Sequence, residues 1–201
     1  KSARGRGGVV EDIRVDNIVM NTIKEEAVIL DLFYDKSNTV EPVSERTPIF
    51  RNIHISNVTA SNVKKAGTIR GIAEMPVQNI SFSNININAQ EGFTVNTVKN
   101  FEFHDVKVNT TIGSSFEIEN SSNFILDNVA TANPIQNVPI IQLKNVFNGV
   151  ITNNFMMVPT SLFIQAEGKQ TRDVFLKNNL LHKVTTVVKR GLDLNKKAII
   201  E

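Results

Sequence analysis

Asparagine recurs at one position of a repeating pattern, and this repeat constrains the fold more than any other feature of the chain. Seven six-residue segments share a polar or small first residue, a strand-like middle and a final Asn or Asp. They end at Asn17, Asn57, Asn84, Asp105, Asn128, Asn154 and Asn178, 21 to 40 residues apart. Asparagine makes up 25 of the 201 residues, although it disfavours helices and ordinary strand interiors, so its abundance requires a positional role.

Each repeat contains a second strand-like run, rich in Val, Ile, Phe and Thr. These runs cover residues 26–34, 66–72, 91–98, 114–120, 138–146, 160–168 and 185–191. Alternation of polar and apolar residues within them is typical of strands, and no sustained apolar stripe of helical spacing occurs. A repeat of about 24 residues with two or three short strands predicts a β-solenoid. A leucine-rich repeat is not favoured, because it needs Leu at several fixed positions.

We therefore predict an all-β chain: a single parallel β-helix of about seven coils over residues 1–201, with a turn-rich, charged insertion at about residues 35–48. Asn tolerates the left-handed backbone of a corner, and stacked Asn side chains can form a hydrogen-bonded column. We expect Asn57, Asn84 and Asn128 to lie at a common corner. Inward phenylalanines such as Phe82, Phe101, Phe103, Phe124 and Phe175 are expected to fill the core.

Composition limits the functions that the chain can have. The formal net charge is +2 without a long run of like charges, which gives little support to nucleic-acid binding or a polybasic membrane contact. No stretch approaches the roughly 18 apolar residues of a membrane helix. The absence of cysteine excludes disulfides, Cys-bound zinc and thiol catalysis within these residues. We expect no metal or cofactor, and His54 and His104 are predicted to face outward from a polar sheet.

The N-terminal stretch "KSARGRGG" combines the cations Lys1, Arg4 and Arg6 with three glycines. A cation suits the binding of a carboxylate, because a charge-assisted hydrogen bond is stronger than a neutral one. The glycines allow the backbone to turn tightly. The alternative interpretation is a solvated basic loop.

Three stretches, "KSARGRGGVVEDIRVDNIVM" (1–20), "EEAVILDLFY" (25–34) and "TPIFRNIHISNVTASN" (47–62), resemble one known family. They are similar to the C-terminal half of bacterial polygalacturonase-like enzymes of glycoside hydrolase family 28. The resemblance implies a right-handed parallel β-helix that hydrolyses pectic polysaccharide with inversion, in a secreted or periplasmic protein. The expected partners are a pectic poly- or oligosaccharide and the missing N-terminal coils of the same protein.

The resemblance also implies specific roles for residues of this chain. Lys1 matches the last residue of the family's Arg-Ile/Leu-Lys element, so the catalytic aspartates are expected upstream and none lies within this chain. Lys1 is then expected to bind substrate, with Arg4 and Arg6 in the same patch. Alignment of the next strand places Glu26 beside the substrate, and Arg70 of the following coil is expected to face the same groove. The alternative for Glu26 and Arg70 is a surface ion pair, which contributes little to stability.

Two other functions remain open from the sequence. One is a non-catalytic β-helix that binds carbohydrate or acts as an adhesin-like module, and the other is a purely structural solenoid. Acidic motifs before Lys1 would favour the enzyme.

Overall fold

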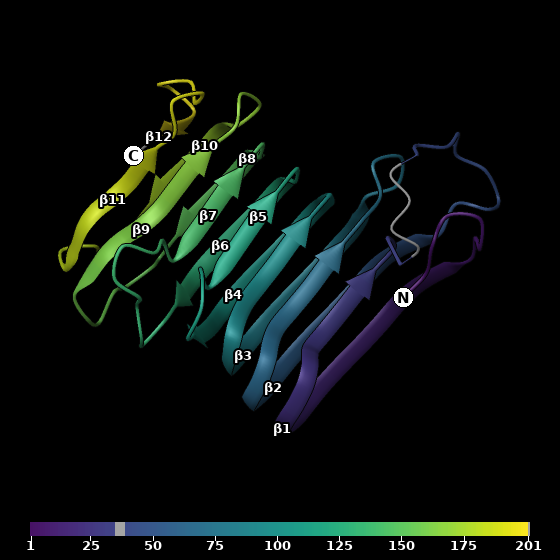
Figure 1. Cartoon of the computed structure of the whole chain (residues 1–201), viewed down its shortest axis with the longest axis horizontal. Helices are drawn as coiled ribbons and strands as arrows, with labels where there is room; N and C mark the ends of the chain where they lie inside the picture. Colours follow the sequence, from purple (N-terminus) through teal and green to yellow (C-terminus); the bar gives the residue numbers. More distant parts are fainter. Residues whose placement is uncertain (35–38, 201) are drawn as a thin grey trace.

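The computed structural model is an elongated stack of strands with the two termini at opposite ends (Figure 1). It describes residues 1–34 and 39–200. The strands are β1 (Val9–Asp31), β2 (Ile49–Arg70), β3 (Val77–Asn96), β4 (Val98–Thr110), β5 (Phe116–Glu119), β6 (Ser122–Ala130), β7 (Ile141–Lys144), β8 (Phe147–Thr152), β9 (Thr160–Glu167), β10 (Arg172–Lys177), β11 (Val184–Arg190) and β12 (Ile199–Ile200). These strands pair in parallel, which confirms the predicted parallel β-helix. Over the ranges just given there is no helix, and so none that is long and apolar enough to cross a membrane.

Two walls of the β-helix carry the features discussed below. The first wall comprises the early parts of β1–β3 and continues through β4, β6, β8 and β10, whereas the second comprises the ends of β1–β3 and continues through β5, β7, β9 and β11. Residues on successive strands pair in register, so their side chains form rows along the axis of the solenoid. The chain completes about six turns, close to the roughly seven coils that the repeats predict.

Residues with left-handed backbone turn the chain at the corners. Asn57, Asn84 and Asn128 have φ values of 54°, 53° and 51°. The Asn84 amide donates to Asn57 Oδ1 at 2.6 Å, and the Asn128 amide donates to Asp105 Oδ1 at 2.6 Å. Asp105 lies in the rung next to Asn84 and shares its left-handed φ. The prediction of a common corner is therefore confirmed.

A second column runs along the other edge of the first wall. The Asn79 amide donates to Asn52 at 3.0 Å, Asn100 to Asn79 at 3.1 Å, Asn123 to Asn100 at 2.8 Å, and Asn148 to Asn123 at 2.8 Å. All five residues have positive φ. The first wall is thus bordered on both edges by stacked carboxamides.

The prediction that Asn154 lies at the corner is wrong by one position. Asn153 has the left-handed φ of 56° and lies in the rung next to Asn128, whereas Asn154 is fully buried. The side chain of Asn154 accepts a hydrogen bond from Val129 N–H at 2.8 Å and donates to Thr152 O at 2.9 Å. The sequence has two consecutive asparagines at this point, and either could have formed the corner. Asn153 forms it, because the side chain of Asn154 is buried and satisfies its hydrogen bonds inside the fold.

Stacked phenylalanines fill the interior between the walls. The rings of Phe82 and Phe103 lie 4.9 Å apart with an interplanar angle of 8°, and those of Phe101 and Phe124 lie 5.5 Å apart. All four residues are at most 2% exposed, which confirms their predicted place in the core. The prediction is wrong for Phe175, which is only partly buried on β10, near the C-terminal end of the stack.

The predicted insertion at about residues 35–48 connects β1 to β2. Residues 39–48 form no strand, and residues 35–38 lie outside the described residues. A turn closes the segment, because Thr47 N–H donates to Ser44 O at 2.9 Å and Thr47 Oγ1 accepts from Ser44 N–H at 2.9 Å. The insertion leaves the pairing of the two strands intact, from Val9 opposite Ile49 at one end to Asp31 opposite Arg70 at the other.

The N-terminal end of the stack exposes the interior of the β-helix. Within the described ranges β1 pairs with β2 alone. Apolar residues of β1 are open to solvent, and Val19 is 84% exposed. A hollow of about 560 Å³ lies at this end, lined by residues that include Val10, Ile13, Leu30 and Phe50. Such an end is a template for another rung.

The outer row of the first wall contains a histidine held between two carboxylates. His104 Nε2 lies 2.9 Å from Glu102 Oε2, and His104 Nδ1 lies 3.1 Å from Asp127 Oδ2. Partial burial lowers the pKa of His104, but the hydrogen bonds to Glu102 and Asp127 outweigh it, so the pKa is raised above its ordinary value. Through its contact with Asp127, His104 therefore joins β4 to β6.

The asparagine column predicts a measurable loss of stability in Asn100→Ala. This change removes two side-chain hydrogen bonds and forces Ala into the left-handed region, so we expect it to cost about 2 kcal/mol in the free energy of unfolding. Asn100→Gly removes the same hydrogen bonds without the backbone strain and should cost less. Equilibrium urea unfolding checks both variants, and equal stability of Asn100→Ala and Asn100→Gly would contradict a strained corner.

The paired histidine predicts that stability depends on pH. Because the pKa of His104 is raised in the folded state, its contribution is complete below the unfolded pKa of about 6.5 and is lost as the pH rises through the folded value. The difference in urea midpoint between the parent protein and His104→Gln should therefore be larger at about pH 5.5 than at about pH 8.5. His182→Gln, at an exposed site beside Phe155, is the matched control for replacing an imidazole by an amide. A His104→Gln difference that is equal at the two pH values would contradict the pairing.

Candidate functional site

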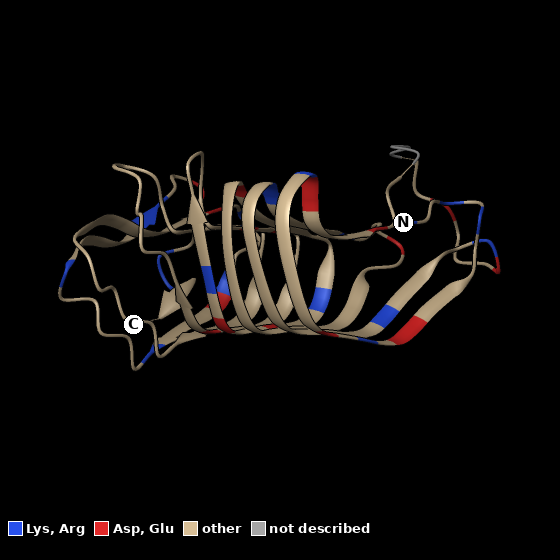
Figure 2. Ribbon diagram, turned by 90° about the horizontal axis from the view of Figure 1, so that it is seen from below, with Lys and Arg blue, Asp and Glu red and all other residues tan. Residues whose placement is uncertain are grey.

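Four of the five predicted site residues lie where the N-terminal segment crosses the ends of β1 and β2. Ser2 N–H donates to Asp31 O at 2.8 Å, and Tyr34 N–H donates to Ser2 O at 3.3 Å. Figure 2 shows that basic and acidic segments lie next to one another at this end of the molecule. The segment is therefore fastened to the strand end by its backbone, and its side chains are placed among charges of both signs.

Glycine provides the turn that follows. Gly5 and Gly7 both donate backbone hydrogen bonds to Arg46 O, at 3.1 and 2.9 Å. Their φ values are 82° and 62°, in the region that favours glycine. A Cβ atom on Gly7 would lie 2.2 Å from Glu45 O, so no other residue fits without displacing the backbone. The sequence prediction of a tight turn is confirmed.

A bidentate ion pair joins the last residues of β1 and β2. Arg70 Nε donates to Asp31 Oδ1 at 2.9 Å, and Arg70 Nη2 donates to Asp31 Oδ2 at 2.7 Å. Burial raises the pKa of Asp31, but the hydrogen bonds from Arg70 and from Phe33 N–H outweigh it, so the pKa lies below its usual value. The hydrogen bond to Asp31 raises the pKa of Arg70. Asp31 is thus a carboxylate whose two oxygens are both hydrogen-bonded to Arg70.

Arg4 forms a second ion pair, which is buried. Its Nη2 donates to Glu74 Oε2 at 2.9 Å, its Nε contacts Glu74 Oε1, and both side chains are 5% exposed. The hydrogen bond from Arg4 lowers the pKa of Glu74. Arg4 was predicted to join the substrate patch, and this geometry favours a structural role for it, because the guanidinium is already neutralised.

The four cations of the site lie over the rings of Phe33 and Tyr34. The guanidinium carbons of Arg4 and Arg70 lie 5.6 and 5.0 Å from the centre of the Phe33 ring. Lys1 Nζ and Arg6 Cζ lie 5.7 and 5.5 Å from the centre of the Tyr34 ring, which is 51% exposed. Contacts of this kind stabilise a cation over a ring face. Lys1 and Arg6, both exposed, therefore form the outer part of the site.

A cleft of about 360 Å³ lies beside the inner pair of cations. Its lining includes Arg4, Phe33, Arg70, Asn96 and Thr97. A flat ring next to amide, hydroxyl and guanidinium groups can contact both the apolar face and the hydroxyls of a sugar. The arrangement is suited to a polar ligand with an apolar face, such as a saccharide unit.

Glu26 lies apart from this cluster. It occurs at an irregularity in the pairing of β1 with β2, opposite Lys65, and accepts a hydrogen bond from Thr68 Oγ1 at 3.3 Å. The carboxylate that pairs with Arg70 is Asp31, so the alternative ion pair between Glu26 and Arg70 is not the one that forms. Glu26 contributes to the site only as a more distant negative charge that raises the pKa of Arg70.

The structure brings four of the five predicted residues together: Lys1 and Arg6 at Tyr34, and Arg4 and Arg70 at Phe33. Sequence reasoning missed Asp31 and Glu74, the partners of the two arginines. The separation of Arg4 from Glu74 is 70 residues, and no local pattern links them. No group of His, Asp and Glu in the described part of the chain is arranged to hold a metal ion.

Comparison with known proteins gives one match. Residues 1–93 match the family model described as glycosyl hydrolases family 28. This stretch contains the N-terminal segment, β1, β2 and most of β3, and therefore all five predicted site residues. No curated protein and no solved structure matches the chain significantly.

The buried ion pair predicts that Glu74→Gln loosens the N-terminal segment. Removing one partner leaves Arg4 buried without a counter-charge, which costs about 3–5 kcal/mol unless the segment detaches. We expect faster hydrogen exchange at the N–H groups of Ser2 and Gly5, measured by mass spectrometry or NMR. The control is Glu25→Gln, in the exposed pair with Lys64. Protection that is unchanged in Glu74→Gln would contradict this role.

Proposed function

The first 93 residues are similar to glycosyl hydrolases family 28, and on this premise we propose that the chain forms the C-terminal coils of a polygalacturonase-like enzyme. The substrate would be a pectic poly- or oligosaccharide, hydrolysed with inversion. The observation that carries the proposal is the coincidence of this family match with a basic, aromatic-lined corner on a parallel β-helix.

Lys1 and Arg6 have the chemistry to contact an acidic sugar. Both are exposed and flank the exposed Tyr34 ring, so a uronate carboxylate could meet two cations while its ring lies against an aromatic surface. Arg70 is held by Asp31 but stays partly exposed, with 35% of its side chain accessible, and it can donate a further hydrogen bond. We assign Arg4 to holding the segment and Glu26 to the edge of the site.

The two acids closest to the basic segment are poorly suited to proton transfer. Asp31 and Glu74 are each held by an arginine, and in both cases the pKa is lowered. An inverting glycosidase needs a protonated carboxyl group as well as a carboxylate, about 6.5–9.5 Å apart. We therefore propose that the catalytic aspartates are supplied by coils upstream of Lys1.

The exposed end of the stack supports this arrangement. β1 offers an open strand edge, and the apolar hollow beside Val10, Ile13 and Phe50 offers a surface on which a preceding rung can pack. A rung placed there would extend both walls and would pack beside Lys1, which also lines the hollow. Because the polymer is extracellular, we also propose that the parent protein is secreted or periplasmic.

A non-catalytic carbohydrate-binding β-helix is the second candidate. It would use the same exposed rings and polar rows without hydrolysis. Release of reducing sugar distinguishes the two functions.

The proposal predicts that Lys1→Ala impairs turnover in the protein that carries this chain with its natural upstream sequence. Loss of one charge-assisted contact should lower kcat/KM for polygalacturonate by about ten- to a hundredfold. Reducing-sugar release measures the effect, and Lys107→Ala, at an exposed site on β4, is the matched control. Unchanged turnover in Lys1→Ala would remove Lys1 from the site, and inactivity of the parent protein would contradict the hydrolase.

A further inference from the structure

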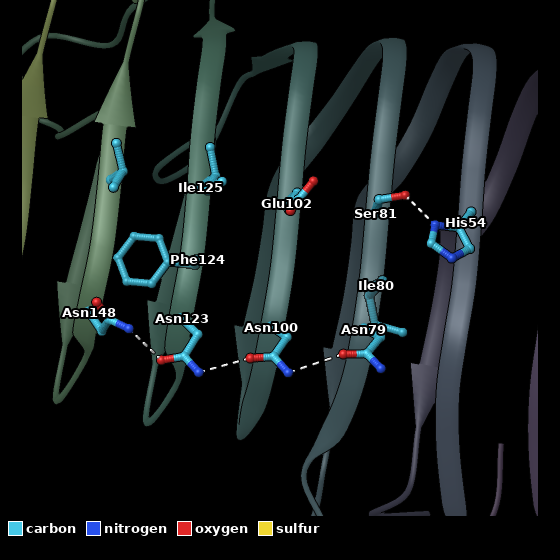
Figure 3. A pocket seen from close by; sticks show the side chains of 11 residues that line it. His54, Asn79, Ile80, Ser81, Asn100, Glu102, Asn123, Phe124, Ile125 and Asn148 are labelled. Carbon is cyan, nitrogen blue, oxygen red and sulfur yellow. Dashed lines mark hydrogen bonds between the residues drawn. The ribbon is translucent and has the colours of Figure 1, made fainter.

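A groove of about 570 Å³ lies along the outside of the first wall, away from the basic corner. Figure 3 shows that it crosses successive rungs, from His54 on β2 to Asn148 at the start of β8. It therefore runs along the axis of the solenoid. A ligand that fits it would be extended, and would meet a similar set of groups every 4.7–4.9 Å or so, the usual distance between strands.

One side of the groove is a row of carboxamides. Asn79, Asn100, Asn123 and Asn148 line it and are hydrogen-bonded to one another in sequence (Figure 3). A primary amide has two N–H donors and an oxygen with two acceptor positions. The column uses one donor and one acceptor position of each inner amide. A donor and an acceptor therefore remain at every rung, which suits the repeated hydroxyls of a sugar chain.

The other side of the groove is polar at one end and apolar at the other. His54, Ser81 and Glu102 occupy one row on successive strands, and His54 Nδ1 lies 2.6 Å from Ser81 Oγ. The same row continues as Ile125 and Val150, both partly exposed. The hydroxyls of a saccharide can bind at the polar end of this row, and its apolar ring faces can pack against Ile125 and Val150.

The charges of the groove oppose an acidic ligand. Its lining contains the carboxylate of Glu102 and no lysine or arginine. Arg14 occupies the same row on β1, next to His54, and lies outside the residues that line the groove. A uronate bound beside Glu102 would place its carboxylate next to that of Glu102, and no lysine or arginine lines the groove to compensate. The neighbouring His104 is already paired with Glu102 and Asp127.

We propose that this groove binds an extended chain of neutral hexoses, lying along the solenoid axis across β2, β3, β4, β6 and β8. The site is separate from the basic corner and goes beyond the function proposed above, because it recognises a neutral polysaccharide and not an acidic one. It would attach the protein to the neutral glycans that accompany acidic polymers. Failure of pectin hydrolysis would leave this binding unaffected.

The geometry of Ser81 and His54 favours binding over acyl transfer. A nucleophilic serine needs donors aimed at a developing oxyanion. Ser81 lies within β3, which pairs with β2 on one side and β4 on the other, so the neighbouring backbone N–H groups are engaged in the sheet. The dyad therefore presents a hydroxyl and an imidazole to the ligand.

Isothermal titration calorimetry of the chain tests the proposal with two probes, the β-1,4-linked hexaose of glucose and the α-1,4-linked hexaose of galacturonate. We expect saturable binding of the neutral hexaose and weaker binding of the acidic one. Ser81→Phe places a ring in the middle of the groove and should weaken binding of the neutral hexaose by about tenfold or more, as expected when steric loss exceeds 1.4 kcal/mol. Ser83→Phe, two residues further on the same strand and outside the groove, should bind as the parent does.

A second variant covers the case in which Ser81→Phe does not fold. Glu102→Gln keeps the size of the side chain, and we expect it to reduce the preference for the neutral over the acidic hexaose by about fivefold, since the repulsion of a uronate by one carboxylate is removed. The proposal is overturned if the neutral hexaose does not bind, if the galacturonate hexaose binds more tightly to the parent chain, or if Ser81→Phe and Ser83→Phe bind alike.

Discussion

The stacking of left-handed asparagines at the corners is the constraint on which the rest of the structure depends. Each corner fixes the phase of the strand that follows, and therefore which residues point inward. Asn84 bonded to Asn57, and Asn128 bonded to Asp105, keep successive rungs at the same phase. Without that alignment, the phenylalanines of neighbouring rungs would not stack, and the outward rows of polar residues would be broken.

Ion pairs hold the N-terminal corner together, as the hydrogen-bonded amide columns hold successive rungs of the walls together. Arg4 with Glu74 and Arg70 with Asp31 join segments far apart in the chain, and Phe33 lies between the two guanidinium groups. These pairs divide the cations of the corner into two classes. Arg4 and Arg70 form ion pairs that stabilise the fold. Lys1 and Arg6 are exposed, so a ligand can reach them.

The same solenoid presents two surfaces of different charge. The corner beside Tyr34 is cationic and aromatic, which suits an acidic sugar, whereas the groove of the first wall has one carboxylate and no cation. The groove follows rows that repeat at the spacing of strands, so it suits an extended polymer. On the two proposals made above, one β-helix would recognise two kinds of saccharide without a second domain.

The sequence by itself determined the parallel β-helix, the corner shared by Asn57, Asn84 and Asn128, the phenylalanine core and the glycine turn, because each is encoded by local pattern and repeat. It also selected the cations of the corner, through the resemblance to a family. Only the tertiary structure decided that Arg4 is buried against Glu74, that Arg70 pairs with Asp31 and not with Glu26, and that Asn153 and not Asn154 forms the corner. These outcomes depend on which groups meet across rungs. Register and burial set those meetings, and no single segment contains that information.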